Sequence, residues 1–284
     1  MTNGIIYSLV NRFKDTVPNR WYTMLVQSIH SLKNHMDIPI CVVTNVLKLK
    51  NDPLFDHVIY VPFNECPLHK RANKGIDYHV FKWKYLMPAS PFENTLHLDS
   101  DTLVLDSFYE VFDLLEHFDL VTKLSVHYLS KRFPDVPDSF PELTGGYIIW
   151  KQTPEIKRFF EVILDLVTRR SGGTDEPFIR KALYHSHVRY SIIQNDYCVN
   201  YGHPQYLFGK AKIIHGQSPY ITEDAKIINY KVYDQFGPFK RLLYGNKAVF
   251  FKKKKQKVMF VKETLPYHGN GWVQDVSEEE RKTL

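Results

Sequence analysis

Short apolar runs alternate with a helical pattern over the first hundred residues, and this alternation constrains the fold more than any other feature of the chain. Gly4 to Val10 is an apolar run as long as a buried strand, and Trp21 to Lys33 follows with apolar residues at helical spacing. Further strands are predicted at Ile38 to Thr44 and His57 to Val61. Strands that alternate with helices predict an α/β fold with a mostly parallel central sheet flanked by helices. Ligands of such sheets bind at the carboxyl ends of the strands.

Similar patterns continue through the middle of the chain. They predict helices at Phe81 to Met87, Ser107 to Phe118, Pro154 to Arg169 and from Glu176 onward. They predict strands at Thr95 to Leu98, near Leu120, at Tyr147 to Trp150, at Val188 to Ile193 and at Ala211 to Ile214.

The segment after His215 is expected to be rich in β structure. Ala248 to Phe251 and Val258 to Val261 read as two strands around an exposed lysine-rich turn. The chain contains no internal repeat and no low-complexity linker. We therefore predict one domain over residues 1–220 and a small β-rich C-terminal extension over residues 221–284 that packs on it.

The composition limits the partners and the redox compartment. The chain has 37 basic and 31 acidic residues, and its net charge of +6 favours an anionic ligand such as a nucleotide diphosphate. Nucleic acid is not expected as a partner. Cys41, Cys66 and Cys198 lie too far apart for a C-x-x-C metal site, and an odd number of cysteines argues against a disulfide framework. A reducing compartment is the expectation.

No targeting or membrane segment is predicted. The N-terminus has no basic region ahead of a long apolar stretch, and no run of about 18 apolar residues occurs in the sequence. We therefore expect a cytoplasmic location and no membrane span.

An acidic pair follows one of the predicted buried strands. In the run L-H-L-D-S-D-T, Asp99 and Asp101 lie where the strand reaches solvent. Two carboxylates at such a position form the hard oxygen site that Mg²⁺ or Mn²⁺ prefers, and a diphosphate can complete the coordination. The metal would act as a Lewis acid on a departing nucleotide. The alternative is an aspartate-rich turn that only caps the next segment, but the apolar strand directly before the pair favours the metal site.

This run resembles the L-D-x-D-T strand of the GT-A nucleotide-sugar transferases, especially glycosyltransferase family 8, the glycogenin and bacterial galactosyltransferase group. In that family a helix with a lysine precedes the strand, and Lys82 lies in such a helix here. A glycine-containing strand start then faces the sugar and acceptor, and T-G-G-Y at Thr144, Gly145 and Gly146 is similar to it. The resemblance implies a Rossmann-like GT-A fold, with a nucleotide-sugar-binding catalytic domain over residues 1–220.

The resemblance also implies catalytic and metal-binding positions. The family has an acidic residue followed by glutamine at a helix start; Asp175 matches the first position, and Glu176 departs from the second. Either carboxylate is a candidate general base for the acceptor hydroxyl, and the stereochemical outcome stays open. A family histidine in an I-H-x-G-like segment joins the aspartates on the metal, and His215 fits it. His268 is the rival, in a segment that lacks the lysine and proline of the family ending.

Donor binding in this fold begins at the end of the first strand. Lys82 and Arg71 are candidates for the diphosphate, and Lys82 is preferred for its place in the motif. The residues expected to bind the donor are Ser8, Val10, Arg12, Lys82, Asp99, Ser100, Asp101, Gly145 and Gly146, and those expected to bind the metal are Asp99, Asp101 and His215.

Together these features predict a metal-dependent glycosyltransferase with Mn²⁺ or Mg²⁺ as cofactor. It would move a hexose or pentose, such as glucose, galactose or xylose, from a UDP-sugar to a hydroxyl of a glycan or glycoconjugate acceptor. The loop from Arg132 to Glu142 is a candidate lid or acceptor-binding segment.

Other functions compete with this prediction. The run from Asp99 also fits the D-x-D-x-T pattern of haloacid dehalogenase-like phosphatases, although that motif normally opens the catalytic domain. A nucleotidyltransferase would have a glycine-rich loop after the first strand, and Val10 to Phe13 contains no glycine. A carbohydrate-binding module without catalysis could stack sugars on the 4 tryptophans and 18 tyrosines.

Overall fold

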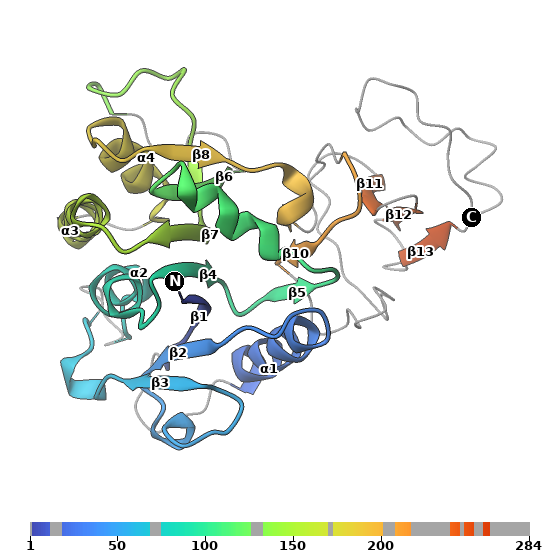
Figure 1. The fold of residues 1–284 in the computed structure, drawn as a ribbon, viewed down its shortest axis with the longest axis horizontal. Helices are drawn as coiled ribbons and strands as arrows, with labels where there is room; N and C mark the ends of the chain where they lie inside the picture. Colours follow the sequence, from blue (N-terminus) through green and yellow to red (C-terminus); the bar gives the residue numbers. More distant parts are fainter. Residues whose placement is uncertain are drawn as a thin grey trace.

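A seven-stranded sheet forms the centre of the molecule (Figure 1). The computed structural model describes residues 2–11, 19–68, 75–125, 133–169, 173–200 and 208–216, and the backbone of three later strands. The strand order is β3-β2-β1-β4-β7-β6-β8. The strands are β1 (Asn3–Leu9), β2 (Ile40–Thr44), β3 (His57–Tyr60), β4 (Asn94–Leu98), β6 (Leu120–Leu124), β7 (Leu143–Lys151) and β8 (Tyr190–Ile192).

Within this sheet, β7 runs antiparallel to both of its neighbours, and every other described pairing is parallel. The α/β class with a mostly parallel sheet is therefore confirmed. The reversal of β7 has a consequence for the site: the start of β7 lies at the same edge of the sheet as the carboxyl end of β4.

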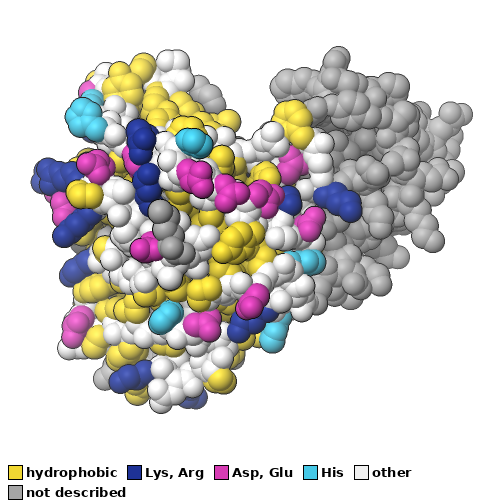
Figure 2. Space-filling model, in the orientation of Figure 1, with side chains coloured by type: hydrophobic (Ala, Val, Ile, Leu, Met, Phe, Trp, Pro, Cys, Tyr) yellow, Lys and Arg dark blue, Asp and Glu magenta, His cyan; other side chains and the backbone are white. Residues whose placement is uncertain are grey.

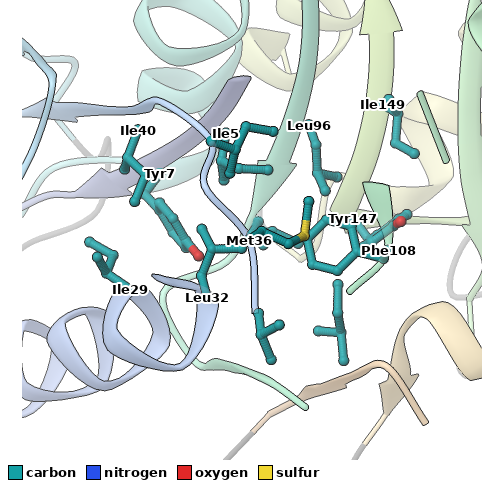
Figure 3. Close-up of a cluster of buried hydrophobic side chains, with 14 of the residues drawn as sticks. Ile5, Tyr7, Ile29, Leu32, Met36, Ile40, Leu96, Phe108, Tyr147 and Ile149 are labelled. Atoms are coloured by element: carbon teal, nitrogen blue, oxygen red, sulfur yellow. The ribbon is translucent and has the colours of Figure 1, made fainter. Parts of the chain in front are cut away.

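Apolar side chains cover both faces of the sheet, as a mostly parallel sheet requires. In β1, Ile5 and Tyr7 belong to the cluster under α1 (Asn19–Lys33), and Ile6 between them belongs to the cluster on the opposite face. Figure 3 shows the first cluster, with side chains from the sheet meeting Ile29 and Leu32 of α1. The opposite face is covered by α3 (Pro154–Arg169) and α4 (Glu176–Tyr184), and Figure 1 shows these helices on the other side of the sheet from α1.

The helix predicted at Phe81 to Met87 is confirmed, but it is longer and irregular. It consists of α2 (Tyr78–Phe81), a π-helical turn η3 (Lys82–Leu86) and a 3-10 turn η4 (Met87–Ala89). It starts earlier because Asp77 caps it, accepting hydrogen bonds from the backbone N–H groups of His79 and Val80. The π turn is wider than an α turn, and such turns are frequent at functional sites.

A second, three-stranded sheet lies beside the acidic pair. It pairs β5 (Thr102–Val104) antiparallel with β10 (Ile213–His215), and β10 parallel with β9 (Val199–Asn200). The sequence predicted β10 but not β5, which follows directly on the acidic pair, or β9, which has only two residues. The predicted helix at Ser107 to Phe118 is a 3-10 helix, η5 (Tyr109–Glu116). Further 3-10 turns are η1 (Leu47–Leu49), η2 (Phe63–Glu65) and η6 (Asn195–Tyr197).

The C-terminal part contains a three-stranded antiparallel sheet. Its strands are β11 (Phe239–Tyr244), β12 (Lys247–Lys252) and β13 (Val258–Val261). The two predicted strands around the lysine-rich turn are thus confirmed, and β11 is an addition. The division into a domain over residues 1–220 and an extension over 221–284 stays a prediction.

The described part of the chain holds no helix that combines the length and the apolar character needed to cross a bilayer. In Figure 2, basic and acidic side chains are interspersed over the described part of one face. That face therefore presents no uniform field of one sign.

The segment predicted to be a lid is held against α4 over its described residues, 133–142. Arg180 of α4 is fully buried and donates from Nε to the Phe140 carbonyl at 2.7 Å and from Nη2 to the Pro137 carbonyl at 2.6 Å. Lys181 and His185 add contacts to Asp135 at 2.8 and 3.0 Å. Arg132, the first residue of the predicted segment, lies outside the described residues.

Replacing Arg180 by methionine should destabilise the fold, because methionine fills the space but leaves two carbonyl groups without their charged donor. We expect a loss of about 3 kcal/mol in the free energy of unfolding, measured by urea denaturation. The control is Arg158→Met on α3, whose side chain is 77% exposed and pairs with Glu161 at 3.3 Å. The control should lose at most about 0.5 kcal/mol. An equal loss in both variants would contradict the role of Arg180.

Candidate active site

The two aspartates of the acidic pair and His215 come together at the carboxyl edge of the sheet. β4 ends just before Asp99, and the β5–β10 ladder places His215 opposite Thr102. His215 Nε2 lies 3.3 Å from Asp99 Oδ2 and 3.5 Å from Asp101 Oδ1. One ligand atom from each of the three residues lies within 4.8 Å of the others. The structure therefore brings the three predicted metal ligands into one group, whereas His268 lies outside the described residues.

The chemistry of this group fits a divalent cation. Two carboxylates and one imidazole form a ligand set suited to Mn²⁺, and Mg²⁺ shares the preference for the carboxylates. The side chains of Asp99, Asp101 and His215 are 27%, 22% and 14% exposed, so an ion there would remain open to a ligand from solvent.

The three side chains change one another's pKa. Burial opposes ionisation of Asp99, but hydrogen bonds with His215 and His97 hold the pKa of this carboxyl well below its usual value. Burial also opposes the charged form of His215, yet hydrogen bonds to Asp101 and Asp99 raise its pKa well above the usual value. A proton on His215 thus supplies positive charge between two carboxylates, at the place where a cation would supply it instead.

The two oxygens of Asp99 have different surroundings. Oδ2 faces His215, while Oδ1 lies 3.3 Å from Nε2 of His97 and 3.4 Å from the hydroxyl of Tyr78. His97 is fully buried, and its Nδ1 lies 3.2 Å from the Ile6 carbonyl. Groups that hold a ligand from behind fix its orientation toward the metal. Sequence reasoning assigned no role to His97 or Tyr78, although a histidine inside an apolar strand was a visible signal.

Gly146 allows the strand β7 to approach the acidic pair. A Cβ atom at this position would lie 2.4 Å from Asp99 Oδ2 and 2.5 Å from Cε1 of His215. The Gly146 carbonyl also accepts a hydrogen bond from the Asp99 N–H at 3.2 Å. The two glycines are part of β7, rather than a lead-in to it as the sequence suggested.

Gly146→Ala should therefore disrupt the candidate metal site and leave the fold largely intact. The added methyl group would displace Asp99 or His215, so we expect at least a tenfold loss of Mn²⁺ affinity in isothermal titration calorimetry. Gly209→Ala is the matched control, since a Cβ there would come no closer than 4.0 Å to its nearest neighbour, Asp196 Oδ1. Unchanged Mn²⁺ binding by the Gly146 variant would argue against the site.

Asp175 is held by three side chains from one face of the helix at 78–89. His79 Nδ1 lies 3.3 Å from Oδ1, Trp83 Nε1 donates to Oδ2 at 2.9 Å, and Lys82 Nζ lies 3.5 Å from Oδ2. The spacing of these residues puts them on one helical face. Burial raises the pKa of Asp175, but the charge of Lys82 and the hydrogen bond from His79 outweigh it and hold the pKa far below its usual value. Asp175 is therefore ionised.

Lys82 is itself buried, and its ammonium also donates to the Gly145 carbonyl. A Cβ atom on Gly145 would lie 3.0 Å from Lys82 Nζ and from both carboxylate oxygens of Asp175. The adjacent glycines of β7 thus face two different charged groups. A direct contact between Lys82 and a diphosphate stays a prediction; the two contacts use two of the three N–H donors of the ammonium.

Glu176, the first residue of α4, has a different environment from Asp175. Its Oε1 accepts a hydrogen bond from the Ser125 hydroxyl at 3.2 Å. Its Oε2 is buried and has no hydrogen-bond partner among the described residues. Burial and the neighbouring charge of Asp175 raise the pKa of Glu176 to about 7. This carboxyl can therefore exchange a proton near neutral pH.

Glu176→Gln should change the pH dependence of stability. With its pKa raised from 4.5 to about 7, folded Glu176 keeps a proton that the unfolded chain has already lost. Its contribution to stability therefore decreases as pH rises from 4.5 to about 7, and the cost is complete above that range. Glutamine cannot ionise and does not lose this stability. Urea denaturation at about pH 8 should therefore show the variant more stable than the unaltered protein by about 1–3 kcal/mol, and the two should be equally stable at pH 4.5.

The control for this experiment is Glu155→Gln, at an exposed position in the first turn of α3. Its stability should stay within about 0.5 kcal/mol of the unaltered protein at both pH values. A constant offset of the Glu176 variant across the pH range would contradict the raised pKa.

The remaining predicted donor-binding residues are placed as follows. Ser8 is buried at the end of β1, and its hydroxyl lies 3.0 Å from that of Tyr78. Val10 is partly buried against the apolar cluster on the α3 side, and Ser100 is half-buried between the two aspartates. Arg12 and Arg71 lie outside the described residues. Their roles in donor binding stay predictions.

No protein-family model and no curated protein sequence matches the chain. Solved structures do match. Mouse xyloside xylosyltransferase 1 aligns with 80% of this chain and 100% of its own, with a TM-score of 0.52 and 11% identity. An active-site mutant of LgtC, with glutamine replaced by glutamate, aligns with 78% of this chain and 91% of its own, with a TM-score of 0.51 and 13% identity.

The protein has the GT-A fold. The bifunctional glycosyltransferase WbbM also matches, with a TM-score of 0.51 and 14% identity over 76% of this chain. The aligned part makes up 46% of WbbM, so this chain spans about half the length of that protein. At these identities the likeness is one of fold. The place of the acidic pair after β4 comes from the structure of this chain and does not rest on the comparisons.

Proposed function

We propose that the protein is a metal-dependent glycosyltransferase that moves a hexose or pentose from a UDP-sugar to a hydroxyl of a glycan acceptor. The observation that carries the proposal is the group formed by Asp99, Asp101 and His215 at the carboxyl edge of a GT-A sheet. Glucose, galactose and xylose are the sugars that the sequence resemblance favours. The glycosyltransferases that share the fold support the reaction class.

Asp99, Asp101 and His215 would hold the Mn²⁺ or Mg²⁺ ion. When bound, such an ion neutralises the charge that develops on a departing nucleoside diphosphate. The groups behind Asp99 support this role, since the Tyr78 hydroxyl and the His97 ring lie at Oδ1 and leave Oδ2 directed toward the proposed metal position.

We assign proton transfer to Glu176 and a structural role to Asp175. Asp175 is a poor proton acceptor because its pKa is strongly lowered and both its oxygens have partners. Glu176 has a pKa of about 7 and a carboxylate oxygen without a hydrogen-bond partner among the described residues. In its ionised form Glu176 would take the proton of the acceptor hydroxyl. The hydroxyl oxygen of the acceptor would then bond to the anomeric carbon of the donor sugar, while the bond from this carbon to the diphosphate breaks.

The other side chains would bind and orient the donor. Ser8, Val10 and Arg12, around the end of β1, would contact the nucleotide. Ser100 and the backbone of Gly145 and Gly146 would line the sugar, as would be expected for small groups that allow close approach. We propose that Lys82 contributes mainly by its charge, given its partners Gly145 and Asp175.

The competing functions are less well supported. A haloacid dehalogenase-like phosphatase carries its acidic motif at the start of its catalytic domain, whereas here three strands of the sheet precede β4, the strand that leads into the motif. A carbohydrate-binding module is less well supported because three candidate metal ligands converge at the carboxyl edge of the sheet, where a diphosphate could bind the ion.

The decisive test is Mn²⁺-dependent binding and turnover of nucleotide sugars. We expect calorimetry to show UDP binding that requires Mn²⁺, and a screen of nucleotide sugars to show UDP release from one of them. Asp101→Ala should reduce this release by at least about 100-fold without lowering the unfolding temperature, because it removes a metal ligand and no core contact.

Asp113→Ala, at an exposed position of η5, is the control and should keep full activity. A fully active Asp101 variant would exclude the metal site, and activity restricted to another nucleotide base would exclude a UDP donor. Sugar binding that needs neither nucleotide nor metal would favour the carbohydrate-binding module instead.

A further inference from the structure

The hydroxyl of Tyr78 connects the first strand to the acidic pair. It lies 3.0 Å from the hydroxyl of Ser8, at the end of β1, and 3.4 Å from Oδ1 of Asp99, after β4. The proposed function gives these two end residues different tasks, because Ser8 would contact the nucleotide and Asp99 would hold the metal. One phenol thus bridges the two halves of the donor site.

The direction of the hydrogen bonds in this chain is fixed by chemistry. An ionised carboxylate can only accept, so Tyr78 donates its proton to Asp99. Its oxygen must therefore accept from Ser8, which donates its own proton to Tyr78. The oxygen of Ser8 keeps its lone pairs and can accept a further hydrogen bond, for example from a ribose hydroxyl.

Tyr78 is held in place by the backbone around it. The preceding residue, Asp77, donates its N–H to the Pro67 carbonyl at 2.9 Å and caps α2 with its side chain. An antiparallel bridge between Leu68 and Ile76 fixes the chain just before it. The backbone that carries the phenol is therefore held by hydrogen bonds. A change in the hydrogen bonding of Ser8 can reach Asp99 through the Tyr78 side chain.

We propose that Tyr78 is a positioning residue that couples nucleotide binding at Ser8 to metal binding at Asp99; this inference rests on the proposed function. A nucleotide that donates a hydrogen bond to Ser8 would strengthen the next two bonds in the same direction, since hydrogen bonds in a chain polarise one another. The result would be a more firmly oriented Asp99, with Oδ2 directed to His215 and the ion. By linkage, the metal must favour the nucleotide to the same extent.

Uridine is the probe that isolates this coupling. UDP would bind Mn²⁺ directly through its phosphates, whereas uridine has none, so any effect of uridine on Mn²⁺ affinity must pass through the protein. We would measure free Mn²⁺ by electron paramagnetic resonance, with and without saturating uridine. In the unaltered protein uridine should tighten Mn²⁺ binding about fivefold.

Tyr78→Phe and Ser8→Ala should each abolish this effect of uridine. In the double variant uridine should likewise leave Mn²⁺ affinity unchanged. Tyr78→Phe should also weaken Mn²⁺ binding in the absence of uridine by about tenfold, as expected when a group behind a metal ligand is removed. Tyr85→Phe is the matched control, because the Tyr85 hydroxyl lies farther along the same helix and donates to the Glu65 carbonyl at 2.6 Å, away from the site. It should keep the full effect.

Three results would overturn the inference, and they distinguish its failure from that of the proposed function. If the unaltered protein binds UDP with Mn²⁺ but uridine leaves Mn²⁺ affinity unchanged, or if Tyr78→Phe keeps the effect, the coupling role of Tyr78 is wrong and the proposed function stands. If the unaltered protein binds no UDP in the presence of Mn²⁺, the proposed function fails and this inference fails with it.

Discussion

The candidate site depends on the short antiparallel ladder between β5 and β10. β5 begins directly after the acidic pair, so the strand that pairs with it must end beside Asp101. β10 does so with His215 opposite Thr102, and the N–H of Gly216 donates to the Asp101 carbonyl at 3.0 Å. A few backbone hydrogen bonds therefore hold together ligands that are far apart in the sequence. Without this ladder the aspartates would be no more than a turn at the end of a strand.

Two carboxylate groups in this site, one buried and one partly exposed, are stabilised in opposite ways. Asp175 has donors at both oxygens and a lysine beside it, so its charge is compensated within the protein. Asp99 has the Tyr78 donor and the His97 ring beside one oxygen, while the other faces His215 and the candidate ion position. Burying a charge is costly unless it is paired. The charge of Asp175 is offset by partners within the protein, whereas Asp99 keeps one oxygen available for a ligand.

The sequence predicted the sheet, the acidic pair and the histidine that joins it, because each leaves a local pattern. An apolar strand followed by D-S-D is visible in one sequence, and so is a short strand that ends in I-I-H-G. The groups behind the ligands were not predicted. His97 lies in β4 itself, two residues before Asp99, and only its burial in the structure shows that it lies behind this carboxylate. Tyr78 comes from α2, and no spacing in the sequence relates it to Ser8 or to Asp99. The length of β7 was also underestimated, because glycines normally end a strand, whereas here Gly146 continues it where any side chain would collide with Asp99.

The contacts of the site depend on the number of residues in the π-helical turn η3. Tyr78 and His79 lie before this turn, and Lys82 and Trp83 lie within it, yet all of them contact carboxylates of the site. Each residue of a regular helix advances the chain by about 100° around its axis. A relative with one residue fewer in this turn would present Tyr78 and His79 to a different neighbour. Alignments of distant relatives should accordingly place gaps in the surrounding loops, and a gap inside this helix would mark a protein in which the two carboxylates are held by other means.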